Sequence, residues 1–174
     1  MAVLRYIDRR DQRLMRRVNR WFAPRWVRVW MTAATRAGDG WLWWTIGATV
    51  LLFGGADRFR AGAAAVLAVG GGILLFLRIK KAANRKRPCE YEEHCWADLL
   101  PPDQFSFPSG HTITAFAFAV SLSRFYPELA PALLFCAVSV GASRIVLGMH
   151  FLSDVVAGAC IGTGLAFAAT MLLR

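Results

Sequence analysis

Acidic residues are scarce in this chain, and their scarcity limits the chemistry that it can support. Eleven Asp and Glu residues stand against 21 Lys and Arg among 174 residues, for a formal net charge of +10. From residue 109 onward the only acids are Glu128 and Asp154. Magnesium and calcium sites are built largely from carboxylate oxygens. This part of the chain therefore offers no carboxylate cluster for such an ion, and we expect neither a metal nor another cofactor.

Charged residues of either sign are also few, at 18% of the chain, whereas 56% is hydrophobic. This composition is too apolar for an ordinary soluble domain. The apolar residues form long blocks that approach the roughly 20 residues needed to cross a bilayer once flanking polar residues are counted. We predict an all-α, multi-pass membrane bundle of about five transmembrane helices, near residues 41–56, 61–79, 109–125, 129–148 and 153–173. A soluble bundle with buried core helices is the alternative.

The N-terminal region lacks an apolar leader, so we expect no cleavable signal peptide. Ten arginines precede Trp41. Apolar residues recur among them at helical spacing, which is typical of an amphipathic helix in the headgroup plane with arginines among anionic lipid phosphates. A nucleic-acid arm would also be basic, but the tryptophans in WFAPRWVRVW favour the membrane interface. We predict an amphipathic interfacial region over residues 1–38 that binds membrane lipids and no nucleic acid.

The four cysteines form two groups. Cys136 and Cys160 lie in apolar segments, where we expect small buried side chains. Cys89 and Cys95 flank a polar stretch and can form a local disulfide if that loop faces an oxidising compartment. Structural or incidental roles remain open for this second pair.

Counting the predicted helices places the N-terminal region, the loop at 82–106 and the turn near His150 on one side of the membrane. The turns at 57–60 and 126–130 and the C-terminus fall on the other side. Ionisable residues at membrane depth are costly and usually functional. Six of them gather on the first side: Lys80, Arg87, His111, Arg144, His150 and Asp154.

Two short motifs supply cations and a helix start. In LRIKKAANRKRPC, Lys80 and Arg87 are two helical turns apart, so we expect them to point from one helix face toward a shared site. In FPSGH, Ser109 is a good N-cap, and Gly110 and His111 occupy a first turn whose free N–H groups favour an anion. Gly110 also lets an oxyanion approach the backbone closely.

The third motif, SRIVLGMHFLSD, contains a candidate nucleophile. Arg144 is the only charge in its apolar segment and needs an anionic partner. His150 and Asp154 are four residues apart, so the carboxylate reaches the imidazole if the backbone is helical there. A histidine held by an aspartate has a fixed tautomer and enhanced basicity, which suits a general base or a nucleophile.

Together the motifs suit phosphoryl transfer without a metal. One imidazole attacks phosphorus, the other protonates the leaving oxygen, and the cations neutralise charge on the remaining oxygens. The patterns K-x6-RP, PSGH and SR-x5-H-x3-D resemble the three signature motifs of the type 2 phosphatidic acid phosphatase (PAP2) family.

The resemblance implies roles for individual residues. His150 is the expected nucleophile that forms a phosphohistidine, with Asp154 orienting it and His111 as general acid and later base. The expected phosphate ligands are Lys80, Arg87, Ser109, Gly110 and Arg144. It also implies that residues 39–174 form a single phosphatase domain that needs no metal. Lipid-directed members of the family often have six membrane helices, and here the Arg-rich segment at residues 1–38 is expected to replace the first.

Three functions are compatible with these motifs. The first is a membrane phosphatase that acts on a phospholipid monoester or on the terminal phosphate of a polyprenyl diphosphate. The second is a lipid-phosphate binder or transporter, which would not require both histidines. The third is a vanadium haloperoxidase, since those enzymes share the anion-binding motifs but are larger and soluble.

The N-terminal arginines favour a cytoplasmic active site in a bacterial-type inner membrane. A periplasmic or extracellular site is the alternative, and a disulfide between Cys89 and Cys95 would agree with it.

Overall fold

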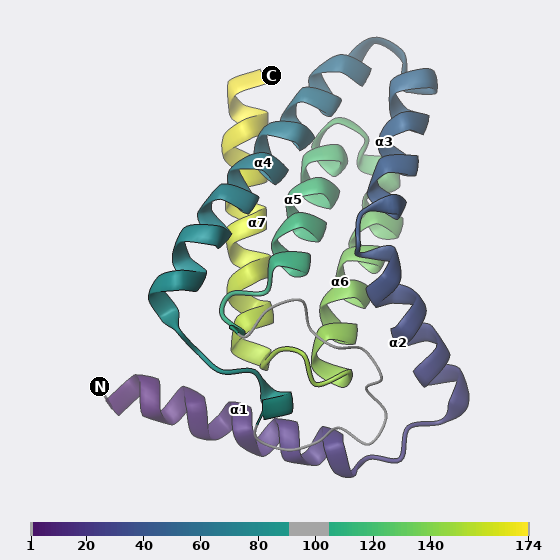
Figure 1. Ribbon diagram of the computed structural model, residues 1–174. Coiled ribbons are helices and arrows are strands. Elements are labelled where there is room, and N and C mark those ends of the chain that lie inside the picture. Colours follow the sequence, from purple (N-terminus) through teal and green to yellow (C-terminus); the bar gives the residue numbers. More distant parts are fainter. Residues whose placement is uncertain (1, 91–104, 174) are drawn as a thin grey trace.

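The computed structural model describes residues 2–90 and 105–173, and side chains from residue 6 onward. Every regular element in this part of the chain is helical (Figure 1). The α-helices are α1 (Ala2–Arg20), α2 (Arg25–Ala37), α3 (Trp41–Phe53), α4 (Arg58–Ala83), α5 (Gly110–Phe125), α6 (Ala130–Val146) and α7 (Leu152–Leu173). Three 3₁₀ turns, η1 (Gly55–Asp57), η2 (Pro88–Glu90) and η3 (Pro127–Leu129), complete the order.

Helix α5 forms the centre of the bundle and packs against α4, α6 and α7 (Figure 1). Its alanines at positions 115, 117 and 119 are fully buried. Helix α7 approaches its backbone closely, because a Cβ added at Gly158 would lie 2.8 Å from the carbonyl oxygen of Ser109. Small residues permit this approach in a membrane, where lipid provides no hydrophobic contrast between helices.

The predicted all-α membrane bundle is confirmed, with helices in all five predicted positions. Three segments of the described chain are long and apolar enough to cross a membrane: 55–83, 127–146 and 152–173, with mean hydropathies of 2.0, 1.8 and 1.9. The other two helices are shorter, at 13 residues for α3 and 16 for α5. At 1.5 Å per residue they extend roughly 20 and 24 Å.

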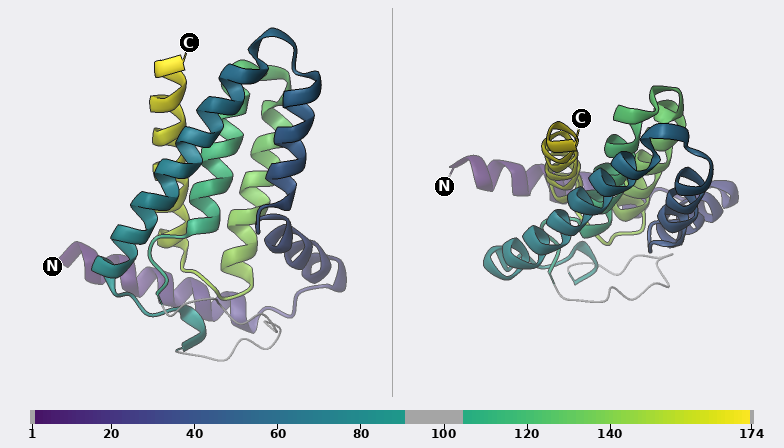
Figure 2. Two further views of the ribbon diagram at one scale, coloured as in Figure 1. Left: turned by 45° about the horizontal axis from the view of Figure 1, so that its top comes forward. Right: turned by 90° about the horizontal axis from the view of Figure 1, so that it is seen from above.

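The N-terminal region contains two helices. Helix α1 crosses the base of the bundle, and α2 rises from it toward α3 (Figures 1 and 2). The six arginines of α1 between residues 9 and 20 are all exposed. Helix α2 packs on α6, where the ring of Trp30 stacks on Phe135 with centroids 5.8 Å apart. Residues 25–37 therefore pack against the bundle itself.

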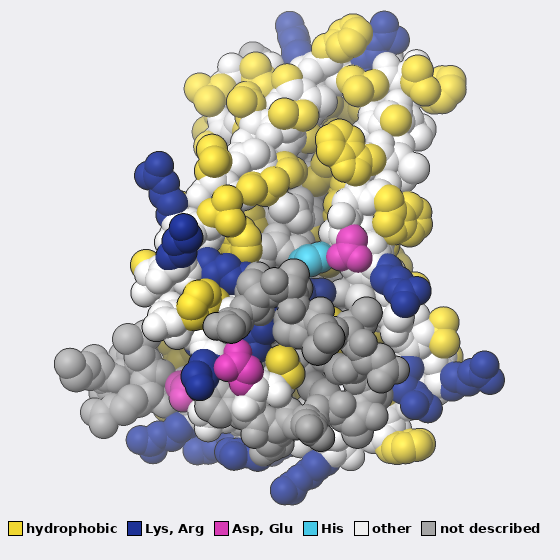
Figure 3. All heavy atoms as spheres, in the orientation of Figure 1, with side chains coloured by type: hydrophobic (Ala, Val, Ile, Leu, Met, Phe, Trp, Pro, Cys, Tyr) yellow, Lys and Arg dark blue, Asp and Glu magenta, His cyan; other side chains and the backbone are white. Residues whose placement is uncertain are grey.

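The two ends of the bundle differ in polarity. The end of α4, the start of α5 and the α6–α7 turn lie beside α1, and the C-terminus and the α3–α4 turn lie at the opposite end (Figure 1). This is the arrangement that counting the helices predicted. Figure 3 shows hydrophobic side chains along the upper bundle, with Lys and Arg gathered around its lower part and at its upper edge.

Two predictions on the cysteines have different outcomes. Cys136 is only half-buried, and Cys160 is exposed, so the expectation that Cys160 is buried is wrong. It lies on α7, whose buried face carries Gly158 and Gly162 instead. Cys95 lies outside the described residues, and the predicted disulfide with Cys89 stays a prediction.

Candidate active site

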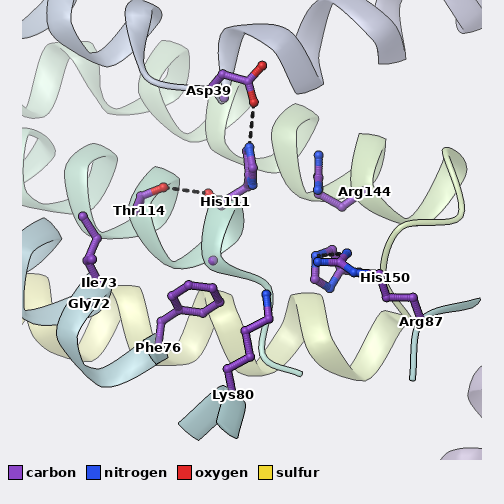
Figure 4. A pocket seen from close by; sticks show the side chains of 12 residues that line it. Asp39, Gly72, Ile73, Phe76, Lys80, Arg87, His111, Thr114, Arg144 and His150 are labelled. Carbon is purple, nitrogen blue, oxygen red and sulfur yellow. Dashed lines mark hydrogen bonds and ion pairs between the residues drawn. The ribbon is translucent and has the colours of Figure 1, made fainter. Parts of the chain in front are cut away.

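A polar cavity of about 370 Å³ opens at the α1 end of the bundle (Figure 4). Six of the predicted site residues line it: Lys80, Arg87, Gly110, His111, Arg144 and His150. They come from α4, α5, α6 and the segments that follow α4 and α6. The other two, Ser109 and Asp154, are fully buried and are not among the lining residues. The fold thus brings together motifs that are far apart in the sequence.

The turn between α6 and α7 fixes the position of His150. The carbonyl oxygen of Arg144 accepts the backbone N–H groups of Met149 and His150, each at 3.0 Å. Gly148 has φ +68° in this turn, a conformation that glycine adopts without steric cost. His150 as a whole is only 3% exposed to solvent, and the turn places its imidazole at the wall of the cavity.

Asp154 lies behind His150, in the first turn of α7. Its Oδ2 accepts the backbone N–H of Phe151 at 2.9 Å and lies 3.6 Å from Nδ1 of His150. At 3.6 Å the second contact is too long for a hydrogen bond, but it places the carboxylate beside the ring nitrogen. The sequence predicted this contact on the condition that the backbone is helical there; His150 precedes α7, so the condition is not met. The turn into α7 achieves the same proximity.

The tautomer of His150 follows from its contact with Arg87. Nη1 of Arg87 lies 3.2 Å from Nε2 of His150. A guanidinium only donates hydrogen bonds, so Nε2 must accept, and in the neutral ring the proton is on Nδ1, toward Asp154. Burial lowers the pKa of His150 to about 4; Asp154 opposes this change, and Arg144 and Arg87 add to it. His150 is therefore neutral near pH 7, with its Nε2 lone pair directed toward Arg87.

Arg87 reaches the site by a different route from the one predicted. Helix α4 ends at Ala83, and Asn84 adopts a left-handed conformation with φ 45°. Asparagine tolerates this helix-ending geometry, so the prediction that Lys80 and Arg87 share a helix face is wrong. Nη1 of Arg87 instead donates to the carbonyl oxygen of Met149 at 2.8 Å. Lys80, in the last turn of α4, has its Nζ 4.5 Å from the ring centroid of Phe76.

The start of α5 combines close packing with an open first turn. Ser109 occupies the N-cap position, but its side chain makes no capping hydrogen bond. Its hydroxyl instead accepts from Thr112 at 2.9 Å, and its N–H donates to the carbonyl oxygen of Asp154 at 3.1 Å. A Cβ at Gly110 would lie 3.1 Å from the ring of Phe76. This tight contact gives a second reason for glycine at that position.

Sequence reasoning missed three residues at this site. The first is Asp39, whose Oδ1 lies 2.8 Å from Nε2 of His111 (Figure 4). Thr35 of α2 accepts a hydrogen bond from Nη1 of Arg144 at 2.7 Å. The scarcity of acidic residues in this chain could have drawn attention to Asp39. Nothing in the sequence distinguished Thr35.

A third missed residue, Arg85, contacts the carboxylate behind His150. Its Nη1 donates to Oδ1 of Asp154 at 2.6 Å. Among the described residues, no three His, Cys, Asp or Glu side chains gather as metal ligands would. The arrangement is two histidines, each beside a carboxylate, facing a cavity that also contains three cationic side chains.

The motifs and their arrangement agree with a comparison with known families. The model of the PAP2 superfamily matches residues 60–174, more than half of the chain. The chain therefore belongs to the PAP2 superfamily.

The individual curated relatives include proteins named as phosphatases. Lipid A 1-phosphatase of Rhizobium etli is 34% identical over 98 residues, which cover 54% of this chain and 42% of that protein. Decaprenylphosphoryl-5-phosphoribose phosphatase of Mycolicibacterium smegmatis is 36% identical over 104 residues, which cover 60% of this chain and 49% of that protein. The match thus spans less than half the length of each of these curated relatives.

A solved structure extends the likeness over nearly the whole fold. The transmembrane PAP2-type phosphatidylglycerolphosphate phosphatase of Bacillus subtilis superposes with a TM-score of 0.74 at 27% identity. The superposition covers 96% of this chain and 86% of that one. The chain is thus a membrane protein of a bacterial type.

Proposed function

We propose that this protein is a metal-independent phosphatase that hydrolyses a membrane lipid phosphate through a phosphohistidine at His150. The observation that carries the proposal is the placement of Nε2 of His150 at the cavity, 3.2 Å from Nη1 of Arg87. The lone pair of Nε2 points toward the Arg87 guanidinium. A phosphate oxygen would bind to this guanidinium, so the lone pair also points toward the position of a bound phosphate.

The cations around the cavity suit a phosphoryl group. Lys80, Arg87 and Arg144 line one cavity with the first turn of α5, whose free N–H groups favour an anion. Such groups stabilise charge on the phosphoryl oxygens in the transition state. A bound phosphate would accept the Arg87 N–H and release the lone pair of His150. The carbonyl oxygen of Met149 would keep the guanidinium in place.

The reaction then proceeds in two displacements. Nε2 of His150 bonds to phosphorus as the bond from phosphorus to the lipid oxygen breaks, and His111 donates a proton to that oxygen. Asp154 stabilises the positive charge that develops on the imidazole of His150. In the second step His111 removes a proton from water, the water oxygen bonds to phosphorus, and the phosphorus–nitrogen bond breaks. Inorganic phosphate leaves, and both histidines return to their starting protonation.

Asp39 joins this scheme as a positioning residue for His111. A carboxylate only accepts hydrogen bonds, so the 2.8 Å contact keeps a proton on Nε2 of His111. The contact also stabilises the imidazolium form of His111, which donates its other ring proton, on Nδ1, to the leaving oxygen and remains as a neutral ring. Asp39 also lines both the polar cavity and a neighbouring groove.

That groove supports a lipid substrate. It has a volume of about 570 Å³ and lies between α3, α4 and α5. Apolar residues dominate its walls, including Trp43, Val50, Leu51, Val66 and Phe118. It shares Gly38, Asp39, Ile73 and Thr114 with the polar cavity. A phosphate in the cavity therefore has an adjoining apolar channel for a hydrocarbon chain.

A substrate panel tests the proposal. Purified protein in detergent would be given lipid A, phosphatidate, phosphatidylglycerol phosphate, undecaprenyl diphosphate and a soluble phosphomonoester, with His150→Ala as the control. We expect phosphate release from at least one lipid in the presence of EDTA, and none from the variant. Turnover by His150→Ala would refute the nucleophile, and activity that EDTA abolishes and magnesium restores would refute the metal-independent mechanism.

The exposed arginines of α1 and three exposed aromatic residues, Trp21, Phe22 and Trp26, suit a helix region against anionic headgroups. From the positive-inside rule, which counts the arginines, we propose that the active site faces the cytoplasm, with the periplasmic or extracellular face as the alternative. Two single-cysteine variants test this orientation with an impermeant thiol reagent in intact cells. One retains Cys89, and the other carries Asp57→Cys at the opposite end. Labelling of Asp57→Cys alone is expected, and labelling of Cys89 alone would reverse the orientation.

A further inference from the structure

A buried carboxylate on α1 contacts the catalytic end of the bundle from outside the region that matches the family model. Asp11 is 5% exposed. Its Oδ2 accepts a hydrogen bond from Nη2 of Arg85 at 2.8 Å and another from the hydroxyl of Ser153. Its Oδ1 accepts the backbone N–H of Ser153 at 3.2 Å. Both oxygens of this carboxylate are therefore used for contacts with the site end of the molecule.

Arg85 connects this carboxylate to Asp154. Its Nη1 donates to Oδ1 of Asp154 at 2.6 Å and to the hydroxyl of Ser153 at 2.7 Å. The guanidinium carbon also lies 4.2 Å from the ring centroid of Phe151. Burial alone would lower the pKa of Arg85, but Asp154 and Asp11 raise it above its ordinary value. The guanidinium is therefore a permanent cation between two buried carboxylates.

The contacts of Asp154 show what this cation does. Arg85 occupies Oδ1, whereas Oδ2 accepts the N–H of Phe151 and lies near Nδ1 of His150. Rotation of the carboxylate would break both hydrogen bonds. Arg85 thus fixes which oxygen of Asp154 faces His150. It can do so only while Asp11 holds the other side of the Arg85 guanidinium.

We propose that Asp11 is a positioning residue for the reaction: it holds Arg85 so that Asp154 presents one oxygen to His150. This inference rests on the proposed phosphatase function. Asp11 touches neither the substrate nor the reacting atoms, and it acts through Arg85 and Asp154. The N-terminal helix would then complete the active site as well as lie at the membrane surface.

Steady-state kinetics of Asp11→Asn on the best lipid of the panel test the proposal. The amide keeps the size of the side chain but removes the charge that anchors Arg85. We expect kcat to fall about tenfold, as for a small misplacement of a reacting group, while KM changes less than about twofold. Asp11→Glu is expected to restore at least half of the parent kcat. Asp57→Asn, at the opposite end of the bundle, makes the same chemical change on an exposed residue and is the control.

A purely structural role gives a different result. It would lower the unfolding midpoint of Asp11→Asn but leave kcat per folded molecule at the parent value, and that outcome would overturn the proposal. Asp8 also contacts Nη2 of Arg85, at 3.2 Å, from a half-exposed position. The double variant Asp8→Asn/Asp11→Asn removes this substitute anchor, and parent kcat in the double variant would likewise refute the role.

Ser153→Ala keeps the test possible if the Asp11 variants do not fold. It deletes the hydroxyl that bonds both Asp11 and Arg85, and we expect kcat to fall about threefold without a change in KM; an unchanged kcat would count against the network. An inactive parent protein would refute the phosphatase function itself. An active parent with an equally active Asp11→Asn would refute only the role of Asp11.

Discussion

In the part of the chain that the structure describes, two His–Asp pairs present an imidazole to one cavity, and the pairs differ in almost every physical respect. His150 and Asp154 are four residues apart, with side chains that are 2% and 0% exposed. His111 and Asp39 are 72 residues apart, with side chains that are 25% and 62% exposed. The same two residue types therefore occupy a closed and an open environment.

This difference suits two different tasks. The closed pair is held by arginines on both sides, Arg87 at the imidazole and Arg85 at the carboxylate. A fixed, neutral imidazole is prepared to attack phosphorus. The open pair lies at the boundary with the apolar groove, where a leaving group and water can both enter. Proton exchange requires such access, so the open pair suits acid–base catalysis.

The largest expected effect separates the two histidines. His150→Ala should reduce kcat at least about 10⁴-fold, because it removes the group that bonds to phosphorus. His111→Ala should still form the phosphoenzyme from a substrate with a good leaving group but should hydrolyse it slowly. Quenching with ³²P-labelled substrate measures the covalent phosphate. Label retained on His150→Ala, or absent from His111→Ala with such a substrate, would contradict the division of roles.

The next effect separates the two carboxylates. Asp154→Asn should lower kcat by about 10³-fold, because the amide cannot stabilise the imidazole charge and can favour the wrong tautomer. Asp39→Asn should lower kcat only about tenfold, because water can replace Asp39 as the hydrogen-bond partner of His111, whose side chain is 25% exposed. Parallel kcat measurements on one lipid substrate provide the check. Equal losses would show that burial does not distinguish the pairs.

The smallest effect concerns pH. The pKa of His150 is lowered to about 4, so its neutral, nucleophilic form persists as the pH falls through 6.5. The acidic limb of kcat/KM should therefore lie below about pH 5, after correction for the ionisation of the substrate measured by ³¹P NMR. An acidic limb near the ordinary histidine value of about 6.5 would show that the folded site does not favour the neutral imidazole.

The sequence predicted the helices and the motif residues because both are local patterns. Charge-free blocks marked the spans, and three short motifs marked six of the residues that line the cavity. Local reasoning failed where it assumed continuity, as in the helix expected to carry both Lys80 and Arg87. A left-handed Asn84 ends that helix early, and its conformation depends on the contacts of the following segment.

The missed contacts all join residues that are distant in the sequence. Asp39 is 72 residues from His111, Thr35 is 109 from Arg144, and Arg85 is 69 from Asp154. No helical period relates such pairs, because their proximity arises only when α2, the turn after it and the segment after α4 pack on the bundle. The sequence could indicate that these residues were polar or acidic, but their partners required the fold.

The contacts of Asp11 also have a consequence for the order of events during synthesis. Asp11 lies near the N-terminus, but its bonds to Ser153 join residues 142 positions apart. These bonds therefore form only after the start of α7 has been made. A growing chain with α1 already on the membrane surface would have a carboxylate waiting for a partner that is translated 142 residues later. The contacts that hold the proposed catalytic pair would be complete only once the start of α7 had been made.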